Sequence, residues 1–408
     1  MTRSTEWRRA TLGEICLEGG GGIQTGPFGS QLHAADYVLD GIPSVMPMNI
    51  GDNVIVEDGI ARISEADATR LSRYRLAEGD IVYSRRGDVE KRALVGQANA
   101  GWLCGTGCLR VRFGSDSQHD SRYISYFLGT QDARDWVVRH AVGATMPNLN
   151  TSILAAVPVA VPPLAVQHAI AEVLGALDDK IAANTKLVEN AADLATSTFL
   201  WAQSLPGSRL PLAGLVTTQY GFTTSAHSEP GPKFLRVTDI NKYPWITWDS
   251  TPNCTISDAD LAKYRVQEGD ILVARMADPG KSAFIDAGDP EAVFASYLVR
   301  LKATHPDDAL FIYYFLRSDE YRNYSDGAMQ GSVQMNMNAK VIIATDIFLP
   351  TRESISLFNK RITPLRRVIQ SVLKENIQLA ATRDALLPQL MSGKLRVSDG
   401  EEILEVAR

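Results

Sequence analysis

An arginine follows a short apolar strand pattern at two distant places in this 408-residue sequence, in YRLAEGDIVYSRRGD (74–88) and in YRVQEGDILVARMAD (264–278). A guanidinium can donate two hydrogen bonds to O6 and N7 of guanine, so a loop that presents one can select a base sequence. From Arg70 to Arg92, seven basic residues stand against four acidic ones. The strand-end arginines Arg85 and Arg275 are therefore candidate nucleic-acid contacts. A solvated charged face is the alternative that the local charge excess alone would favour.

Loops in both halves of the chain contain other residue types that read bases or bind phosphates. Asn and Gln read adenine, Ser and Thr hydroxyls contact phosphates, and glycine lets the backbone approach a ligand. The first-half candidates are Gln24, Thr25, Phe28, Ser30, Gln31, Ser84, Arg85, Arg86, Lys91, Arg92, Thr145, Asn148 and Asn150. The second-half candidates are Tyr220, Thr223, Thr224, Arg275, Lys281, Gln330, Ser332, Gln334, Asn336 and Asn338. Each loop alone also fits an ordinary turn, and the pairing of loops across the halves favours recognition.

The two halves of the chain repeat one another. At an offset of 190 residues, LSRYRLAEGDIVYSRR (71–86) and LAKYRVQEGDILVARM (261–276) share eight of sixteen residues. At an offset of 188, GATMPNLN (143–150) falls on GSVQMNMN (331–338). Such self-similarity indicates duplicated structural units. The loops differ more than the strands between them, so the halves are expected to share a scaffold and to recognise different sequences.

No catalytic or metal-binding motif accompanies these candidates. G-x-S-x-G and H-E-x-x-H are absent, and PGKS (279–282) lacks the first glycine of a phosphate-binding loop because that position is Arg275. Cys104 and Cys108 form a C-x3-C pair without a second pair or nearby histidine, so reduced structural thiols are expected rather than a zinc site. We expect a chain that performs no chemistry alone and holds no metal.

Composition narrows the class of protein further. The net charge of -6 argues against nonspecific coating of nucleic acid, which depends on neutralising phosphates with Lys and Arg. The longest apolar runs, such as 153–166, are interrupted by proline and are shorter than the roughly 20 residues that span a bilayer. We therefore expect a cytoplasmic protein with no membrane partner.

Two long helical segments carry apolar stripes with alternating four-three spacing, which predicts packing against another helix. The first stripe is Ile170, Leu174, Leu177, Ile181, Asn184, Val188, Ala191 and Ala195. The second is Phe358, Ile362, Leu365, Ile369, Val372, Asn376, Leu379 and Arg383. Asn184 and Asn376 are candidates for fixing the register of the pair. Pro364 predicts a kink or interruption of the second helix, and packing of each stripe on its own globular part remains the alternative.

These elements must hold the candidate loops apart. Segments of nearly 40 residues would reach roughly 60 Å as straight helices, and a pair of them would set the distance between two globular parts. The predicted fold class is α+β, with two pseudo-symmetric mixed α/β domains separated by two long helices. The predicted domains are residues 1–160, a helical spacer at 161–205, a second domain at 206–350 and a second spacer at 351–408.

Several motifs resemble those of the specificity subunit of type I restriction-modification systems. They are TGPFGSQL (25–32), LAEGDIVYSRRGD (76–88), MPNLN (146–150), VPVAVPPLAVQ (157–167), LGALDDKI (174–181) and TRDALLPQLMSGKLRV (382–397). The resemblance covers essentially the whole chain, and its C-terminal stretch is the most specific part. It implies two target recognition domains, an antiparallel coiled coil of the two helical spacers, and no catalytic centre in this chain. Arg85 and Arg275 match the family's strand-end arginine, whereas Arg86 opposite Met276 and Glu90 opposite Gly280 depart from a clean repeat.

The resemblance also implies the partners. The expected target is double-stranded DNA with a bipartite, asymmetric site. The chain would assemble with two methylase subunits, which bind S-adenosylmethionine and methylate adenine, and with restriction subunits, which use ATP and Mg²⁺. No cofactor is expected on this chain itself. Two alternatives stay open: a recognition fragment of a combined restriction-methylation enzyme, and a coiled-coil adaptor that binds only proteins.

Overall fold

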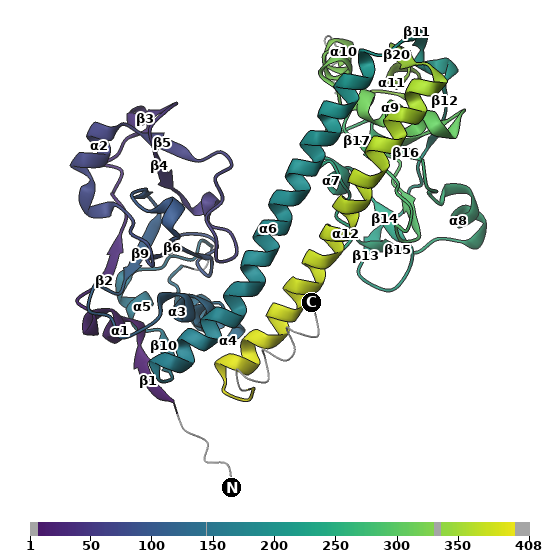
Figure 1. Ribbon diagram of the computed structural model, residues 1–408. Coiled ribbons are helices and arrows are strands. Elements are labelled where there is room, and N and C mark those ends of the chain that lie inside the picture. The colour runs from purple at the N-terminus through teal and green to yellow at the C-terminus, as the bar shows by residue number, and fades with distance from the viewer. Residues whose placement is uncertain (1–6, 144, 330–335, 396–408) are drawn as a thin grey trace. The chain divides into compact units, whose positions relative to one another are not determined.

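The structure is a computed structural model that describes residues 7–143, 145–329 and 336–395 (Figure 1). The chain forms two compact units, the first from residues 1–181 and 378–408 and the second from residues 182–377. Two helices of 40 residues, α6 (Leu164–Gln203) and α12 (Arg352–Met391), each contribute to both units. The fold is α+β with duplicated mixed halves and two long helices, as predicted. The four-part domain division stays a prediction, although α6 and α12 lie inside its two helical segments.

The first unit contains two four-stranded sheets and a two-stranded ribbon. The antiparallel main sheet has the order β2 (Gly22–Thr25), β9 (Cys108–Arg112), β6 (Ile81–Ser84) and β7 (Arg92–Leu94). The second sheet has the order β3 (Tyr37–Val38), β5 (Ala61–Ile63), β4 (Ile42–Val45) and β8 (Leu103–Cys104). The ribbon pairs β1 (Arg8–Thr11) with β10 (Pro158–Val161). The helices are α1 (Leu12–Glu18), α2 (Glu65–Arg70), α3 (Ser121–Leu128), α4 (Gln131–His140) and α5 (Thr151–Ala155).

The second unit repeats this strand order, which confirms the internal repeat at the level of topology. Its main sheet has the order β12 (Val216–Tyr220), β19 (Leu298–Ala303), β16 (Ile271–Ala274) and β17 (Ser282–Phe284). Its second sheet has the order β13 (Ala226–His227), β15 (Asn253–Cys254), β14 (Lys233–Leu235) and β18 (Ala292–Phe294). Its ribbon pairs β11 (Gly207–Pro211) with β20 (Asp346–Pro350). The helices are α7 (Val237–Ile240), α8 (Asp258–Tyr264), α9 (Ala309–Leu316), α10 (Asp319–Met329) and α11 (Ala339–Ile342).

The repeated Glu-Gly-Asp sequence builds the turn that starts β6 and β16. Gly79 and Gly269 have φ of +82° and +87°, a conformation that glycine adopts without strain. The carboxylate of Asp80 accepts a hydrogen bond from the backbone N–H of Ala77 (2.8 Å) and contacts Arg112 on the neighbouring strand. Asp270 accepts one from the N–H of Gln267 (2.9 Å) and pairs with Arg300 at 3.2 Å. The shared motif is therefore part of the scaffold.

Each unit has its own apolar core against one end of the helix pair. In the first unit, Tyr83 and Tyr123 are buried with Leu174 of α6 and Leu390 of α12. In the second unit, a larger aromatic cluster includes Phe199 of α6, Phe311 of α9 and Phe358 of α12. Near the helix ends, residues of the predicted stripes therefore pack on the globular parts, which was the alternative to packing of helix against helix.

In the second unit α6 and α12 also pack directly against each other and run in opposite directions (Figure 1). Val188, Ala191, Ile369 and Val372 form a separate buried cluster between them. Nδ2 of Asn184 donates to Oδ1 of Asn376 at 2.9 Å, so the two polar stripe residues meet. The predicted interruption at Pro364 is wrong, because α12 continues through it. Proline removes one backbone donor, while the flanking stripe residues Ile362 and Leu365 pack with the unit's core.

Candidate nucleic-acid interface

Arg85 stands directly after β6 and its backbone is fixed from two sides. Its N–H donates to the carbonyl of Gly107 (2.8 Å), and its own carbonyl accepts from the N–H of Leu149 (2.8 Å). The guanidinium carbon lies 5.7 Å from the centre of the Phe28 ring. Nε of Arg85 is buried and has no hydrogen-bond partner among the described residues. Three distant segments thus hold one cation over an aromatic ring.

Arg275 has the same surroundings in the second unit. Its N–H donates to the carbonyl of Tyr297 (2.9 Å), and its carbonyl accepts from the N–H of Met337 (2.8 Å). The guanidinium carbon lies 5.1 Å from the centre of the Tyr220 ring, and Nε is again buried without a partner among the described residues. The hydroxyl of Tyr220 accepts from the N–H of Ala339 at 3.0 Å, which fixes the ring. The fold therefore reproduces the arginine-on-aromatic arrangement in both halves.

These two arginines are suited to binding rather than to catalysis. Within residues 7–143, 145–329 and 336–395, no carboxylate forms an ion pair with Arg85 or Arg275. A guanidinium has five N–H donors in a fixed fork, and it cannot lose its proton under ordinary conditions. Stacking on Phe28 or Tyr220 orients the fork without consuming its terminal donors. An acceptor pair such as guanine O6 and N7, or two phosphate oxygens, matches that geometry.

Several first-half candidates lie around Arg85. Phe28 is half exposed, Ser30 is exposed and Thr25 ends β2. Arg86 is exposed, and its backbone forms an isolated bridge with Asn148, which brings segment 145–150 beside the arginine loop. Thr145 is exposed in that segment. The structure therefore gathers the loops at 25–31, 84–86 and 145–150 around one arginine.

Other first-half candidates have roles inside the unit. Oε1 of Gln24 accepts from Arg110 (2.8 Å), Oε1 of Gln31 accepts from the Tyr74 hydroxyl (2.9 Å), and Lys91 pairs with Asp88 at 2.9 Å. The side chain of Asn150 caps α5 by accepting from the N–H of Ile153. Such capping is an ordinary structural role for asparagine, as the turn interpretation expected.

Ser84 and Arg92 are buried, which corrects their assignment as ligand contacts. Ser84 is 1% exposed, and its hydroxyl donates to the carbonyl of Arg86 at 2.9 Å. Arg92 is 5% exposed, its Nε donates to the carbonyl of Ser125 (2.6 Å), and Asp52 lies 3.7 Å away. Burial lowers the pKa of the Arg92 guanidinium, because desolvation disfavours its charged form. Both side chains serve the fold.

Second-half candidates divide in the same way. Thr223 is exposed, Asn336 is exposed and bridges to Met276, and Lys281 is exposed beside the Arg275 loop. The hydroxyl of Thr224 donates to the carbonyl of Thr255 at 3.5 Å. Asn338 caps α11 through the N–H of Val341, as Asn150 caps α5. Gln330, Ser332 and Gln334 lie outside the described residues.

Sequence reasoning missed Arg317 and Arg322, which lie near Lys281 in the second unit. At an offset of 188 the first-half counterpart of Arg322 is Arg134, whereas the counterpart of Arg317 is Gly129. The change from Gly129 to Arg317 after two matching helices could have indicated this site, because it adds a cation in the second half only.

The described residues were also compared with the requirements of a metal site. No group of three or more His, Cys, Asp or Glu side chains among them is placed to hold a metal ion. The four cysteines are buried free thiols, and burial raises the pKa of Cys104 to about 12. No helix within the described ranges is both long and apolar enough to cross a membrane.

The chain is similar in sequence to known proteins of one kind. Residues 44–191 match the family model described as the type I restriction modification DNA specificity domain. The type I restriction enzyme MjaVIII specificity subunit of Methanocaldococcus jannaschii is 23% identical over 308 residues, 69% of this chain and 71% of that protein. The HindI specificity subunit of Haemophilus influenzae is 25% identical over 167 residues, 40% of this chain and 35% of that protein.

The fold also resembles a solved structure. The crystal structure of the type I restriction-modification system S subunit from M. genitalium superposes with a TM-score of 0.61. The two chains are 14% identical, and the match covers 96% of this chain and 97% of that one. At this identity the likeness concerns the fold, which is the duplicated arrangement of mixed units and long helices.

Proposed function

We propose that this chain is a specificity subunit of a type I restriction-modification system and gives such a complex its DNA sequence preference, as its similarity to such subunits supports. Each unit reads one half of a bipartite target in double-stranded DNA. The observation that carries the proposal is the matched pair of arginines, Arg85 over Phe28 and Arg275 over Tyr220, at the same strand end in both units.

The target is asymmetric because the surroundings of the two arginines differ. Arg85 is followed by a second arginine, Arg86, whereas Arg275 is followed by Met276. The supporting ring is a phenylalanine in one half and a tyrosine in the other. A shared scaffold with different neighbours at each base-reading loop produces two unlike half-sites, since base contacts specify sequence while the scaffold only positions them.

The catalytic subunits are separate chains in this proposal. The helix pair formed by α6 and α12 sets the spacing of the half-sites and docks two methylase subunits, which hold S-adenosylmethionine. Restriction subunits, where the host supplies them, bring ATP and Mg²⁺. This chain contributes binding energy and selectivity but no reacting group.

The test uses the full chain assembled with its methylase subunits and a DNA target defined by methylation mapping of the host genome. Arg85→Ala is expected to weaken binding through the first half-site by about 1 to 3 kcal/mol, with preference at the second half-site retained. Arg275→Ala should give the reverse pattern. Equilibrium binding to duplexes with single substitutions in each half-site measures both.

Two further variants sharpen the interpretation. Arg85→Lys keeps the charge but loses the bidentate fork, so base preference should fall while affinity for unrelated DNA stays. Arg139→Ala is the matched control, because among the described residues the side chain of this exposed arginine bonds only to its own helix, at the carbonyl of Asp135. Absence of protection at two short blocks in footprinting would favour a protein adaptor. S-adenosylmethionine binding by the isolated chain would favour a combined enzyme.

A further inference from the structure

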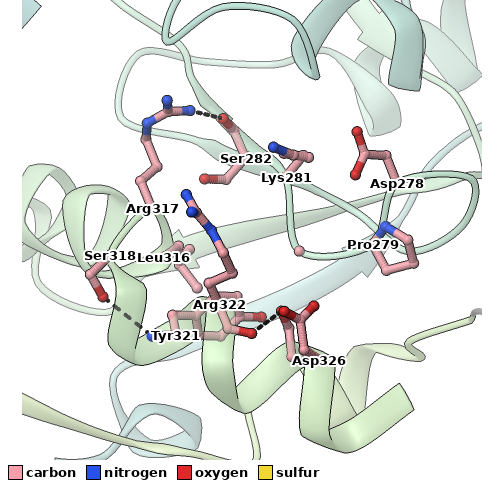
Figure 2. Close-up of a pocket in the computed structure, with 12 residues that line it drawn as sticks. Asp278, Pro279, Lys281, Ser282, Leu316, Arg317, Ser318, Tyr321, Arg322 and Asp326 are labelled. Atoms are coloured by element: carbon pink, nitrogen blue, oxygen red, sulfur yellow. Dashed lines mark hydrogen bonds between the residues drawn. The ribbon is translucent and has the colours of Figure 1, made fainter. Parts of the chain in front are cut away.

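The second unit has a polar pocket of about 260 Å³ beside the Arg275 loop. Its lining includes Lys281, Ser282, Arg317, Tyr321, Arg322 and Asp326. Figure 2 shows the side chains of Arg317 and Arg322 extending from the helical side of the pocket toward Ser282. Nη1 of Arg317 donates to the backbone carbonyl of Ser282 at 3.2 Å. Three cationic side chains thus line one small space together with two carboxylates, those of Asp278 and Asp326.

The first unit fills the corresponding space with its own arginine. Arg92 in β7 pairs with Tyr83, and Ser282 in β17 pairs with Val273 at the matching register position. Gly129 ends α3, and Arg317 ends α9 in the same way. A Cβ on Gly129 would lie 1.9 Å from Nη2 of Arg92, so the buried guanidinium occupies that place. In the first unit the strand carries the arginine and the helix ends at a glycine. In the second unit the strand carries a serine and the helix ends at an arginine.

This exchange changes how the charges are neutralised. In the first unit Lys91 pairs with Asp88 (2.9 Å), Arg92 lies 3.7 Å from Asp52, and Arg134 pairs with Glu90 (2.9 Å). Each cation there has a carboxylate.

In the second unit Gly280 replaces Glu90, and the counterpart of Arg134 is Arg322. Arg322 pairs only with Asp319 at 3.6 Å, between side chains that are 63% and 90% exposed. Such a surface pair contributes little. Within the described part of the chain, Lys281 and Arg317 have no carboxylate within ion-pair distance, and Asp278 instead accepts a hydrogen bond from Asn241.

A buried hydroxyl also points to a ligand. Ser282 is 1% exposed, yet its Oγ has no hydrogen-bond partner among the described residues. Leaving such a group unpaired is unfavourable unless something else binds it. The pocket is smaller than the ~300 to 1,000 Å³ of typical small-molecule sites. A single anionic group with several acceptor oxygens fits its size, its charge and its unused donors.

We propose that this pocket binds one backbone phosphate of the DNA beside the second half-site, and that the first unit has no equivalent contact because Arg92 closes the space. The inference rests on the proposed function. One hairpin links the two sites, because the N–H of Ala274 donates to the carbonyl of Lys281 and the N–H of Gly280 donates to the carbonyl of Ala274. Arg275 then contacts a base while Lys281 and Arg317 hold the neighbouring strand in register.

The first test measures the salt dependence of binding by the complex with its methylase subunits. Arg317→Gln and Lys281→Gln should each weaken binding to all sequences and leave base preference unchanged. The slope of log K against log salt should become shallower by about 0.9, the value for one phosphate contact. Lys302→Gln, which removes the same charge from β19, is the matched control and should leave the slope unchanged. An unchanged slope in both pocket variants overturns the inference.

The second test exchanges the two arrangements. Ser282→Arg with Arg317→Gly recreates the first unit's filled space and should give the same shallower slope. Arg92→Ser with Gly129→Arg should open a pocket in the first unit and steepen the slope by a similar amount. Gly129 has φ of -87°, so a side chain is tolerated there once Arg92 is removed. If neither pair changes the slope, the exchange has no role in phosphate binding.

The third test identifies the source of the phosphate. Replacing single phosphates of the target by neutral methylphosphonates should reveal one position in the second half-site whose effect disappears in Arg317→Gln. Competition by millimolar inorganic phosphate without such a position would mean that the pocket takes a free anion, which overturns the DNA assignment. Failure of the wild-type complex to bind a bipartite target would instead overturn the proposed function itself.

Discussion

At the scale of single residues, Asp80 and Asp270 explain why the Glu-Gly-Asp motif occurs twice. Each carboxylate closes the turn before a core strand, β6 or β16. Each also binds an arginine of the strand paired with it in the sheet, β9 or β19. Asp80 is 2% exposed, so these donors take the place of water around its carboxylate. Asp80→Asn should destabilise the first unit by roughly 1 to 3 kcal/mol, since one amide cannot replace the charge-assisted contacts to Arg112.

Urea unfolding followed by circular dichroism measures this loss. Asp88→Asn is the control, because Asp88 is largely exposed and makes only a surface pair with Lys91. Equal stability of the two variants would mean that the Asp80 network contributes nothing beyond a surface ion pair.

A second residue-scale prediction concerns Asp289 and pH. Burial raises the pKa of this carboxyl from 3.8 to about 6, while a hydrogen bond from the backbone N–H of Asp286 (2.8 Å) opposes the rise. Trp248 Nε1 donates to it at 2.9 Å, and Arg366 of α12 binds Asp286 beside it. Because the folded pKa lies above the unfolded one, the folded state binds more protons between about pH 4 and pH 6. Stability should therefore fall as pH rises through that range.

Asp289→Asn removes this titration and keeps an acceptor for Trp248. It should stabilise the second unit by roughly 1 to 2 kcal/mol near pH 7.5, after discounting for partial exposure, and lose that advantage near pH 4. Thermal unfolding at the two pH values tests it. A melting-temperature difference that is independent of pH would contradict the raised pKa.

Residue-level prediction from sequence was most specific where the repeat carried the signal. Arg85 and Arg275 stand at matching positions because the same strand precedes both, and their role as DNA contacts stays a prediction. Arg92 was misassigned and Arg317 was missed for one reason: an arginine from a strand and an arginine from a helix end occupy equivalent places. Which element supplies a side chain to a shared space depends on tertiary packing, which the spacing of charges does not reveal.

At the scale of elements, the helix pair has a polar contact inside an apolar seam. Asn184 is 4% exposed and donates to Asn376 and to Glu375, both at 2.9 Å. Asn184→Leu should cost about 1 to 2 kcal/mol, because it removes these bonds beside partly buried polar neighbours. Asn184→Leu with Asn376→Leu should recover stability, as apolar replacements of buried polar pairs often do, but with weaker control of register.

Urea unfolding measures the stability, and disulfide trapping between cysteines introduced at neighbouring seam positions measures the register. A double variant that is stable and forms only one crosslinked species would show that the Asn pair does not specify register.

The four-three stripes predicted α6 and α12 because both carry a long periodic signal. The sequence could not predict that the same stripe also closes the globular core at each end. Phe358 and Ile362 belong to the aromatic core of the second unit, while Ile369 and Val372 belong to the seam. The residue types at the stripe positions are the same in the globular core and in the helix seam. Only the tertiary structure shows to which of the two a given stripe residue belongs.

At the scale of the whole molecule, the duplication predicted equal strand order in the two halves, and both pairs of sheets have it. The predicted boundaries at residues 160 and 350 follow the change from strand to helix, whereas the compact units divide inside the helices near residues 181 and 377. The helical periodicity continues across these two points, so composition and spacing do not predict where the compact units divide.

Separate cores imply that the two units lose structure separately. Phe358→Ala removes a fully buried ring that lies 5.3 Å from Phe311, which should cost the second unit about 3 to 5 kcal/mol. Hydrogen exchange should then accelerate in β16, β19 and α9, while β6 and β9 keep their protection, because cooperative units open with their own free energies. Leu174→Ala, at a fully buried position of the first unit, should give the opposite pattern. Equal acceleration in both units for either variant would mean that α6 and α12 transmit the loss, and that the chain unfolds as one cooperative body.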